Sequence, residues 1–189
     1  MNFENDIKEC VKVLKAGGII LYPTDTIWGL GCDATNKEAV AKIYSLKQRS
    51  ENKSMIVLLT DQNQIKDYCK SPSHSIKIIM RNEIRPLTII YPNAKNLALN
   101  LIGNDDTIAI RIVKDSFCES IIHYLKQPIV STSANISGSE SPKNFKDISK
   151  EIINGVDYVV NYRRDDKDIK AASKILMWKN DNEIIILRE

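Results

Sequence analysis

Two cationic side chains stand close together in the segment KQRSENKS, where a predicted helix ends. They are Lys47 and Arg49, and Lys53 follows shortly after them. Arginine can hold a phosphate with two parallel donors and lysine adds a mobile positive charge, so the pair suits an anion site. Basic residues at this place also serve as a solvated helix end that interacts favourably with the helix dipole. The residues alone leave both interpretations open.

Short polar side chains form a second cluster in the segment STSANISG, directly after the apolar residues 128–130. Ser131, Ser133 and Asn135 supply small donors and acceptors suited to the same anion or to a ribose, although such residues also serve in turns and helix caps. Open sheets bind ligands at polar loops that follow strands. Loops 22–33, 47–54 and 131–138 are therefore where we expect a ligand site.

A glycine pattern in the first of these loops offers a different class of enzyme. Residues 29–34, GLGCDA, match the dinucleotide-binding pattern G-x-G-x-x-G/A, and Glu51 follows at a distance suited to a ribose hydroxyl. That pattern should begin where a strand ends, whereas six residues separate Tyr22 from Gly29. A turn that needs glycine is the simpler interpretation. The chain contains no G-x-x-x-x-G-K-[ST] motif, so any ATP would be bound without a P-loop.

Other side chains that could do chemistry are few. The four cysteines form no C-x-x-C pair, which predicts reduced, buried thiols, and the two histidines offer little for a triad or a metal site. The net charge of +3 is too small to indicate nucleic-acid binding. The chain lacks a run of roughly 20 apolar residues and its start is acidic, so we expect a cytoplasmic protein without a secretory signal or membrane contact.

Alternating helix and strand patterns must position these segments. We expect one domain, residues 1–189, since domains of roughly 100 to 200 residues are usual. Helices are predicted near 4–16, after the capping pattern that begins at Thr35, and at 61–69, 73–81, 115–126 and 144–153. Strands are predicted at 18–22, 55–59, 87–91, 107–113, 128–131 and 157–161, and a hairpin at 174–178 and 184–188 about residues 180–182. Residues 162–172 are expected to form a loop. The fold class is therefore α/β or α+β, with helices packed against a sheet.

Four motifs follow one another along the chain: GGIILYPTDTIWGLGCDA, the helix end LKQR, the strand AIRI and the loop STSANISG. This ordered set, from about Ile7 to Arg188, resembles the short form of the YrdC-like family of threonylcarbamoyl-AMP synthases. The resemblance implies a twisted, open, mixed sheet with flanking helices around a large, positively lined cavity. It also implies that L-threonine, bicarbonate and ATP give threonylcarbamoyl-AMP and pyrophosphate, with Mg²⁺ held mainly by ATP and water. A separate tRNA threonylcarbamoyl transferase complex would then use the product.

The resemblance also assigns roles to single residues. The family's basic and polar quartet corresponds to Lys47, Arg49, Ser133 and Asn135, and its two cations would stabilise the transferring phosphoryl group and the leaving pyrophosphate. Thr24 matches a position that contacts the amino-acid substrate, and Arg111 one that holds its carboxylate. The positions that line the nucleotide pocket correspond to Ser131, Ser173 and Arg188.

Three departures from the family pattern affect the far wall of that pocket. Residues 83–86 read EIRP where relatives have Trp-Pro-Gly-Pro, residues 172–175 read ASKI where relatives have Pro-Ser-Thr-Ile or Glu-Ser-Thr-Ile, and Ser50 replaces a proline. A second hypothesis is therefore a divergent paralogue that binds nucleotide or RNA, including tRNA or double-stranded RNA, with little synthase activity. Salt-dependent RNA affinity without ATP turnover would favour this second hypothesis.

Overall fold

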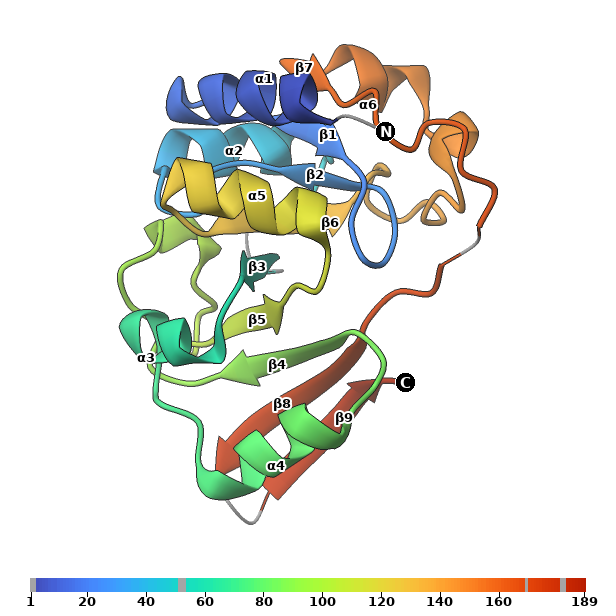
Figure 1. The fold of residues 1–189 in the computed structure, drawn as a ribbon. Helices are drawn as coiled ribbons and strands as arrows, with labels where there is room; N and C mark the ends of the chain where they lie inside the picture. The colour runs from blue at the N-terminus through green and yellow to red at the C-terminus, as the bar shows by residue number, and fades with distance from the viewer. Residues whose placement is uncertain (1–2, 51–53, 169, 181–182) are drawn as a thin grey trace.

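A long, twisted sheet runs through the molecule (Figure 1). The computed structural model describes residues 3–50, 54–168, 170–180 and 183–189. The strands in these ranges are β1 (Ile20–Tyr22), β2 (Gly29–Gly31), β3 (Ile56–Leu59), β4 (Leu87–Tyr91), β5 (Ile108–Ile112), β6 (Ile129–Ser133), β7 (Tyr158–Val159), β8 (Lys174–Asn180) and β9 (Glu183–Arg188). These described strands form one sheet in the order β7-β1-β2-β6-β3-β5-β4-β8-β9.

The sheet is mixed, which confirms the predicted fold class. The pairs β1 with β7, β3 with β5, and β4 with β8 are parallel. The remaining neighbours pair antiparallel. Helices separate the parallel partners β3 and β5 along the chain, as parallel crossovers require.

Strand β2 corrects the prediction that residues 22–33 form a loop. Gly29 and Leu30 pair with Ser133 and Thr132 of β6, and β2 also pairs with β1. A Cβ atom on Gly31 would lie 2.6 Å from Cε1 of Tyr22 and 3.0 Å from the carbonyl oxygen of Val130. Only glycine permits this close approach of strands, and a glycine-rich strand carries no β-propensity by which the sequence could reveal it.

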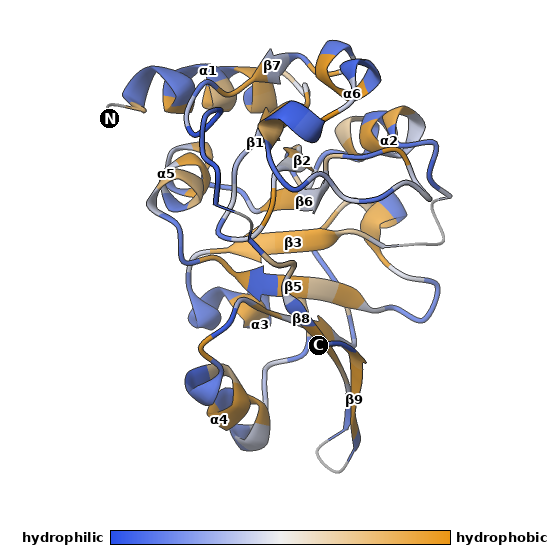
Figure 2. Cartoon of the chain, turned by 90° about the vertical axis from the view of Figure 1, so that its right-hand side faces the viewer, coloured by the Kyte–Doolittle hydropathy of each residue, from blue (hydrophilic) through white to orange (hydrophobic). Residues whose placement is uncertain are grey.

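The helices flank both sides of the sheet. They are α1 (Glu4–Lys15), α2 (Lys37–Leu46), α3 (Ile65–Tyr68), α4 (His74–Asn82), α5 (Ser116–Leu125) and α6 (Lys150–Asn154). Helices α1 and α5 pack against each other on one side of β1, β2 and β6, and α2 lies on the other side (Figures 1 and 2). The apolar positions predicted for α5 are all buried, because they recur at helical spacing on one face.

Capping residues fix where two helices begin. The side chain of Asn36 accepts a hydrogen bond from the backbone N–H of Ala39 at 3.0 Å and caps α2. The predicted cap, Thr35, is one residue too early, and its hydroxyl donates to Asp33 at 2.7 Å instead. Asp115 caps α5 by accepting from the N–H of Cys118 at 3.1 Å.

Several predicted boundaries shift. The helix expected at 61–69 is a 3₁₀ turn, Gln62–Gln64, followed by α3, and the helix expected at 144–153 is a 3₁₀ turn, Phe145–Asp147, followed by α6. The strand predicted at 157–161 is shorter. The strand predicted to end at residue 131 continues to Ser133, because it pairs with the unpredicted β2. Ser131 and Ser133 of the second polar cluster therefore belong to β6. The turn residues 181–182 lie outside the described residues.

Apolar side chains from the sheet and the helices form one core. Figure 2 shows apolar strands in the middle of the molecule and helices with one apolar and one polar face. All four cysteines are buried and free, as predicted. No helix in the described part of the chain is long and apolar enough to cross a membrane.

Candidate functional site

An open cavity of about 620 Å³ lies against the central strands. Six of the nine predicted site residues line it: Arg49, Arg111, Ser131, Ser133, Ser173 and Arg188. They come from the segment after α2, from β5, from β6, from the residue before β8, and from β9. The fold thus brings together residues that are far apart in the sequence and gives the cavity three guanidinium groups.

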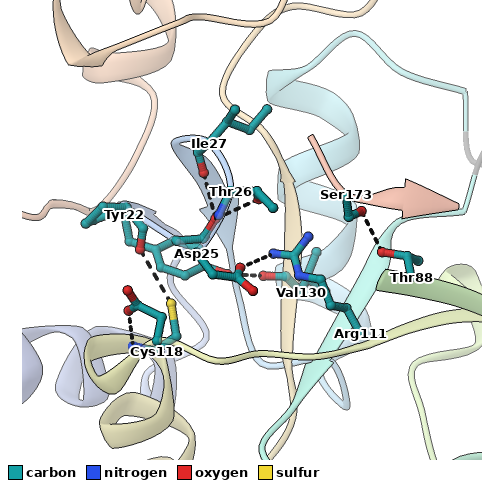
Figure 3. A network of polar contacts seen from close by, with 12 residues as sticks. Tyr22, Asp25, Thr26, Ile27, Thr88, Arg111, Cys118, Val130 and Ser173 are labelled. Carbon is teal, nitrogen blue, oxygen red and sulfur yellow. Dashed lines mark hydrogen bonds and ion pairs between the residues drawn. The ribbon is translucent and has the colours of Figure 1, made fainter. Parts of the chain in front are cut away.

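Arg111 is the most deeply buried of the three arginines. It lies in the middle of β5 and only 2% of its surface is exposed. Its Nη2 atom is 3.0 Å from Oδ1 of Asp25, and Figure 3 shows this ion pair between β5 and the loop that joins β1 to β2. A buried guanidinium without a partner would be strongly destabilising, so Asp25 is what allows Arg111 to stand at the cavity.

Arg188 reaches the cavity from β9 through contacts with Ser173. Its Nε donates to the carbonyl oxygen of Ser173 at 2.8 Å and its Nη2 donates to the serine hydroxyl at 3.2 Å. That hydroxyl also lies 2.7 Å from the hydroxyl of Thr88 (Figure 3). Burial, with a smaller contribution from the charge of Arg111, lowers the pKa of Arg188. The two arginines therefore raise the positive potential of one region, which favours an anionic ligand.

Arg49 lines the cavity from the segment that follows α2. Gln48 adopts a left-handed conformation with φ of 50°, which turns the chain after the helix. The Nη2 of Arg49 donates to the carbonyl oxygen of Ser54 at 2.9 Å. Burial lowers its pKa, although an arginine remains charged at any physiological pH.

Lys47 does not line the cavity. It is 1% exposed, and its ammonium donates to the backbone carbonyls of Ser133 and of Asn135, the second at 2.6 Å. Its own carbonyl accepts from the N–H of Ser137. Burial, reinforced by the charge of Arg49, lowers the pKa of Lys47 to about 8. The ammonium thus lies behind the strand end and shapes the backbone that carries Ser133.

Asn135 and Thr24 also lie beside the cavity and not on its wall. The amide of Asn135 donates to the carbonyl oxygens of Ile136 at 3.0 Å and Ser139 at 2.7 Å, so it holds the loop after β6. Thr24 is buried, and its hydroxyl lies 2.9 Å from that of Thr26, which does line the cavity. These two predicted residues do not face the space that a ligand would fill, but each bonds to a residue that does: Thr24 to Thr26, and Asn135 to Ser133.

An apolar wall of the cavity was not predicted. Side chains of Met55, Ile56, Ile90, Ala109, Ile175 and Met177 form it. Most of these residues lie in β3, β4, β5 and β8, at alternating positions of the strands. Alternating apolar residues are typical of any buried strand face, so the sequence does not distinguish them from core residues. Trp28 lines the cavity too and packs on Phe145 with ring centroids 4.9 Å apart, whereas Tyr22 is fully buried. The residue that sequence reasoning missed and that matters most is Asp25, which was visible only as the third letter of PTDT.

The dinucleotide interpretation of residues 29–34 is wrong. A dinucleotide-binding pattern needs its glycines in the turn between a strand and a helix. Here Gly29 and Gly31 both pair with β1, and Gly29 also pairs with Ser133 of β6, so the two glycines lie in a strand inside the sheet. Glu51 and Lys53, the other charges considered for a ligand, lie outside the described residues.

Metal ligands are scarce around the cavity. No group of three or more His, Cys, Asp or Glu side chains able to hold a metal ion occurs among the described residues. Asp105 is a carboxylate that lines the cavity. One carboxylate is a typical protein contribution to Mg²⁺ that arrives with substrate phosphates, and a dedicated site needs more.

Comparison with known sequences identifies the family. The model of the Sua5, YciO and YrdC family, described as "Telomere recombination", matches residues 12–189. The chain belongs to this family. Among its curated relatives, a threonylcarbamoyl-AMP synthase of Psychromonas ingrahamii is 31% identical over 150 residues, covering 78% of both chains. A second, from Idiomarina loihiensis, is 33% identical over 147 residues, covering 76% of this chain and 79% of the relative.

Solved structures of other family members share the fold. Sua5 from P. abyssi, determined with L-threonine, superposes with a TM-score of 0.85 at 22% identity and covers 98% of this chain. This chain spans 54% of that longer Sua5 chain. YciO from E. coli superposes with a TM-score of 0.83 at 21% identity, covering 98% of this chain and 89% of YciO. These likenesses confirm the predicted architecture of the family fold.

Two of the three departures from the family pattern, at residues 83–86 and 172–175, gather at one end of β8 and β9. Glu83 and Arg85 form ion pairs with each other, with Lys174 and with Glu189. Lys174 and Glu189 are the direct neighbours of Ser173 and Arg188 in the chain. The charged residues that replace the family's usual pattern therefore form a cluster next to the cavity wall, and none of them lines the 620 Å³ cavity.

Proposed function

We propose that the protein is a threonylcarbamoyl-AMP synthase, which converts L-threonine, bicarbonate and ATP into threonylcarbamoyl-AMP and pyrophosphate. The observation that carries the proposal is the gathering of Arg49, Arg111 and Arg188 on one cavity, in a chain whose relatives bear that name. This reaction brings together an amino-acid carboxylate, whose carbamate carries a second negative charge, and a polyphosphate. A cavity that catalyses it needs several cations, and the described part of the chain supplies three.

The reaction requires no covalent intermediate on the protein. The amine of threonine condenses with bicarbonate, losing water, to give a carbamate. A carbamate oxygen then bonds to the α-phosphorus of ATP while the bond to the pyrophosphate oxygen breaks. The protein must hold two anions that repel each other and stabilise the charge of the transferring phosphoryl group, which are tasks of positioning and electrostatics.

The cavity offers a distinct surface for each part of these substrates. Arg49 and the serine hydroxyls of β6 suit the phosphates, because they combine a positive charge with small donors. The apolar wall formed by Met55, Ile56, Ile90, Ala109, Ile175 and Met177 suits the adenine ring. Arg111, on β5, suits the carboxylate of threonine. Lys47 would act from behind Ser133, by holding its backbone and adding to the local positive potential.

Mg²⁺ and the later fate of the product complete the proposal. Mg²⁺ would enter with ATP as the MgATP substrate, since the described residues offer no dedicated metal cluster. The unstable mixed anhydride would pass to a tRNA threonylcarbamoyl transferase complex in the cytoplasm. Contact with tRNA itself is not needed for this chemistry.

A product assay by mass spectrometry tests the proposal. A mixture of the protein with threonine, bicarbonate and MgATP should yield threonylcarbamoyl-AMP, and omission of any substrate should abolish it. Arg49→Ala should lower the rate by roughly 30- to 1000-fold, the loss of about 2–4 kcal/mol of transition-state stabilisation. The matched control is Arg81→Ala on α4, an exposed arginine outside the cavity, which should keep full activity.

Two results would contradict the proposal. One is release of pyrophosphate that does not depend on threonine. The other is a wild-type protein that turns over no ATP yet binds tRNA with an affinity that falls steeply with salt, which would favour the RNA-binding paralogue.

A further inference from the structure

We propose that Asp25 is a positioning residue that orients Arg111 to receive the carboxylate of the amino-acid substrate. The inference rests on the proposed function, and it gives a role to a side chain that does not itself line the substrate cavity. Three features of the structure support it: the side from which Asp25 approaches, the donors that Arg111 keeps, and the turn that holds Asp25.

Asp25 approaches Arg111 from outside the substrate cavity. Strand β5 alternates, so that Ala109 and Arg111 line the 620 Å³ cavity while Ile110 and Ile112 line a second cavity of about 250 Å³. Asp25 lines this second cavity, together with the two isoleucines. Its carboxylate therefore neutralises the guanidinium without occupying the space where a substrate would bind.

The contact leaves donors of Arg111 unused. Although Oδ1 of Asp25 lies 3.0 Å from Nη2, the pair does not meet the geometry of a hydrogen bond. Among the described residues, Nε and Nη2 of Arg111 are buried atoms without a hydrogen-bond partner. Both atoms are enclosed by the protein, so a substrate in the cavity cannot reach them, and Nη1 is the nitrogen of Arg111 left to donate to a carboxylate.

A tight turn fixes Asp25 in its place. The hydroxyl of Thr24 accepts from the N–H of Thr26 at 3.0 Å and donates to the carbonyl oxygen of Ile27 at 2.8 Å. These bonds flank Asp25 on both sides and join the loop to the cavity wall at Thr26 (Figure 3). In this arrangement the two threonines of PTDT build the turn and the aspartate between them faces the arginine.

The test compares binding of the two substrates to variants of the pair. Asp25→Asn keeps the size of the side chain and removes its charge. We expect its Kd for threonine to rise about tenfold or more while its Kd for ATP changes less than about twofold, as measured by calorimetry. Asp33→Asn is the matched control, because Asp33 lies beyond β2, its carboxylate accepts hydrogen bonds from Thr35, and it lines neither cavity.

A double-mutant cycle shows whether Asp25 acts through Arg111. In an Arg111→Met background, Asp25→Asn should cause no further loss of threonine affinity, and the doubly neutral variant avoids an unpaired buried charge. An equal effect on both substrates, no effect on either, or a loss that persists with Met at position 111 would overturn the inference.

A second measurement does not depend on the substrate. The Nε–H of a fixed, buried arginine exchanges slowly with water, so the ¹⁵N-labelled protein should show a protected Arg111 signal that Asp25→Asn removes. A wild-type protein with this protected signal that binds ATP but not threonine would contradict the proposed function. A signal that is unprotected in the wild type, or that survives in Asp25→Asn, would contradict the positioning role.

Discussion

The ammonium of Lys47 donates hydrogen bonds to the backbone carbonyls of Ser133 and Asn135, and this contact joins the end of α2 to the end of β6. The side chain of Lys47 therefore links the two segments that the sequence suggested for an anion site, 47–54 and 131–138, by bonding to backbone carbonyls of the second. Arg49 and Ser133 line the cavity, while Lys47 and Asn135 shape the backbone beside it. The first prediction concerns the charge of this lysine.

We expect ATP affinity to fall as the pH rises through about 8. Burial and the charge of Arg49 lower the pKa of Lys47 to about 8, so its ammonium loses its proton well below the ordinary lysine value. A neutral amine still donates two hydrogen bonds, so the loop keeps its shape while the positive charge behind Ser133 disappears. The loss of one charge at this range is worth about 1 kcal/mol, or about a fivefold rise in the Kd of ATP between about pH 7 and pH 9.

The control for this pH effect is Lys47→Met. Methionine is similar in length and carries no charge, so the variant should bind ATP more weakly at neutral pH and show no step near pH 8. If calorimetry found the same step in the variant, another group would be responsible for it.

The second prediction is that Gly31→Ala destabilises the fold. The added methyl group would lie 2.6 Å from the ring of Tyr22, which is fully buried and donates a hydrogen bond to the carbonyl oxygen of Val130 at 3.1 Å. Overpacking of this kind lowers the free energy of unfolding by about 1–3 kcal/mol. Urea denaturation measures the change, and a loss below about 0.5 kcal/mol would show that the strands can move apart.

A compensating substitution separates crowding from other effects of alanine. Tyr22→Leu removes the ring edge that the methyl group meets. The double variant should therefore be more stable than the sum of the two single losses predicts, because the two sites are in contact. Simple additivity would mean that the ring of Tyr22 is not what excludes a side chain at position 31.

These two residues also show why the sequence revealed most of the fold but not β2. Strong periodicity made α5 predictable, because its apolar residues repeat at helical spacing. The segment Gly-Leu-Gly has no such signal, and its strand conformation depends on contacts with Tyr22 and Val130 that lie elsewhere in the chain. Without β2, the extension of β6 to Ser133 could not be predicted either.

The same distinction applies to the candidate site. Residue type and family resemblance selected nine side chains, of which six line the cavity. They could not show that the ammonium of Lys47 donates its hydrogen bonds to backbone carbonyls. Nor could they show that Asp25 contacts Arg111, which lies 86 residues later in the chain. Such contacts depend on how a loop returns across the sheet, and the sequence contains no local pattern for that.

The third prediction concerns the four cysteines. Each is buried, and burial raises the pKa of every thiol, that of Cys69 to about 12. Because the thiolate is the reactive form, the native protein should not react with a thiol reagent at neutral pH, and four thiols should react in urea. An added Tyr124→Cys, at an exposed position of α5, should contribute one fast-reacting thiol and serves as the control. Fast reaction of any thiol in the unmodified native protein would contradict the buried positions.

The last prediction concerns Asp6, which joins α1 to the segment that leads from β7 toward Ser173. Its carboxylate accepts from the N–H groups of Asn161 at 3.0 Å and Tyr162 at 2.9 Å, and from the hydroxyl of Tyr158 at 2.5 Å. Burial alone would raise the pKa of Asp6, but these hydrogen bonds outweigh it and lower the pKa. Asp6→Asn should therefore lower the free energy of unfolding at neutral pH by about 2–3 kcal/mol, since hydrogen bonds to a charged group are lost.

The pH dependence gives this prediction its sign. A carboxyl group whose pKa is lower in the folded protein stabilises the fold above its unfolded value of about 3.9, and the stabilisation is lost as the pH falls through the folded value. The difference in unfolding free energy between the wild type and Asp6→Asn should thus shrink below about pH 4. Glu9→Gln, at an exposed position of the same helix where the carboxylate pairs with Lys12, should change stability by less than about 0.5 kcal/mol at any of these pH values. A difference between Asp6→Asn and the wild type that stays constant down to low pH would mean that the side chain acts by shape and that its charge contributes nothing to holding α1 against the segment after β7.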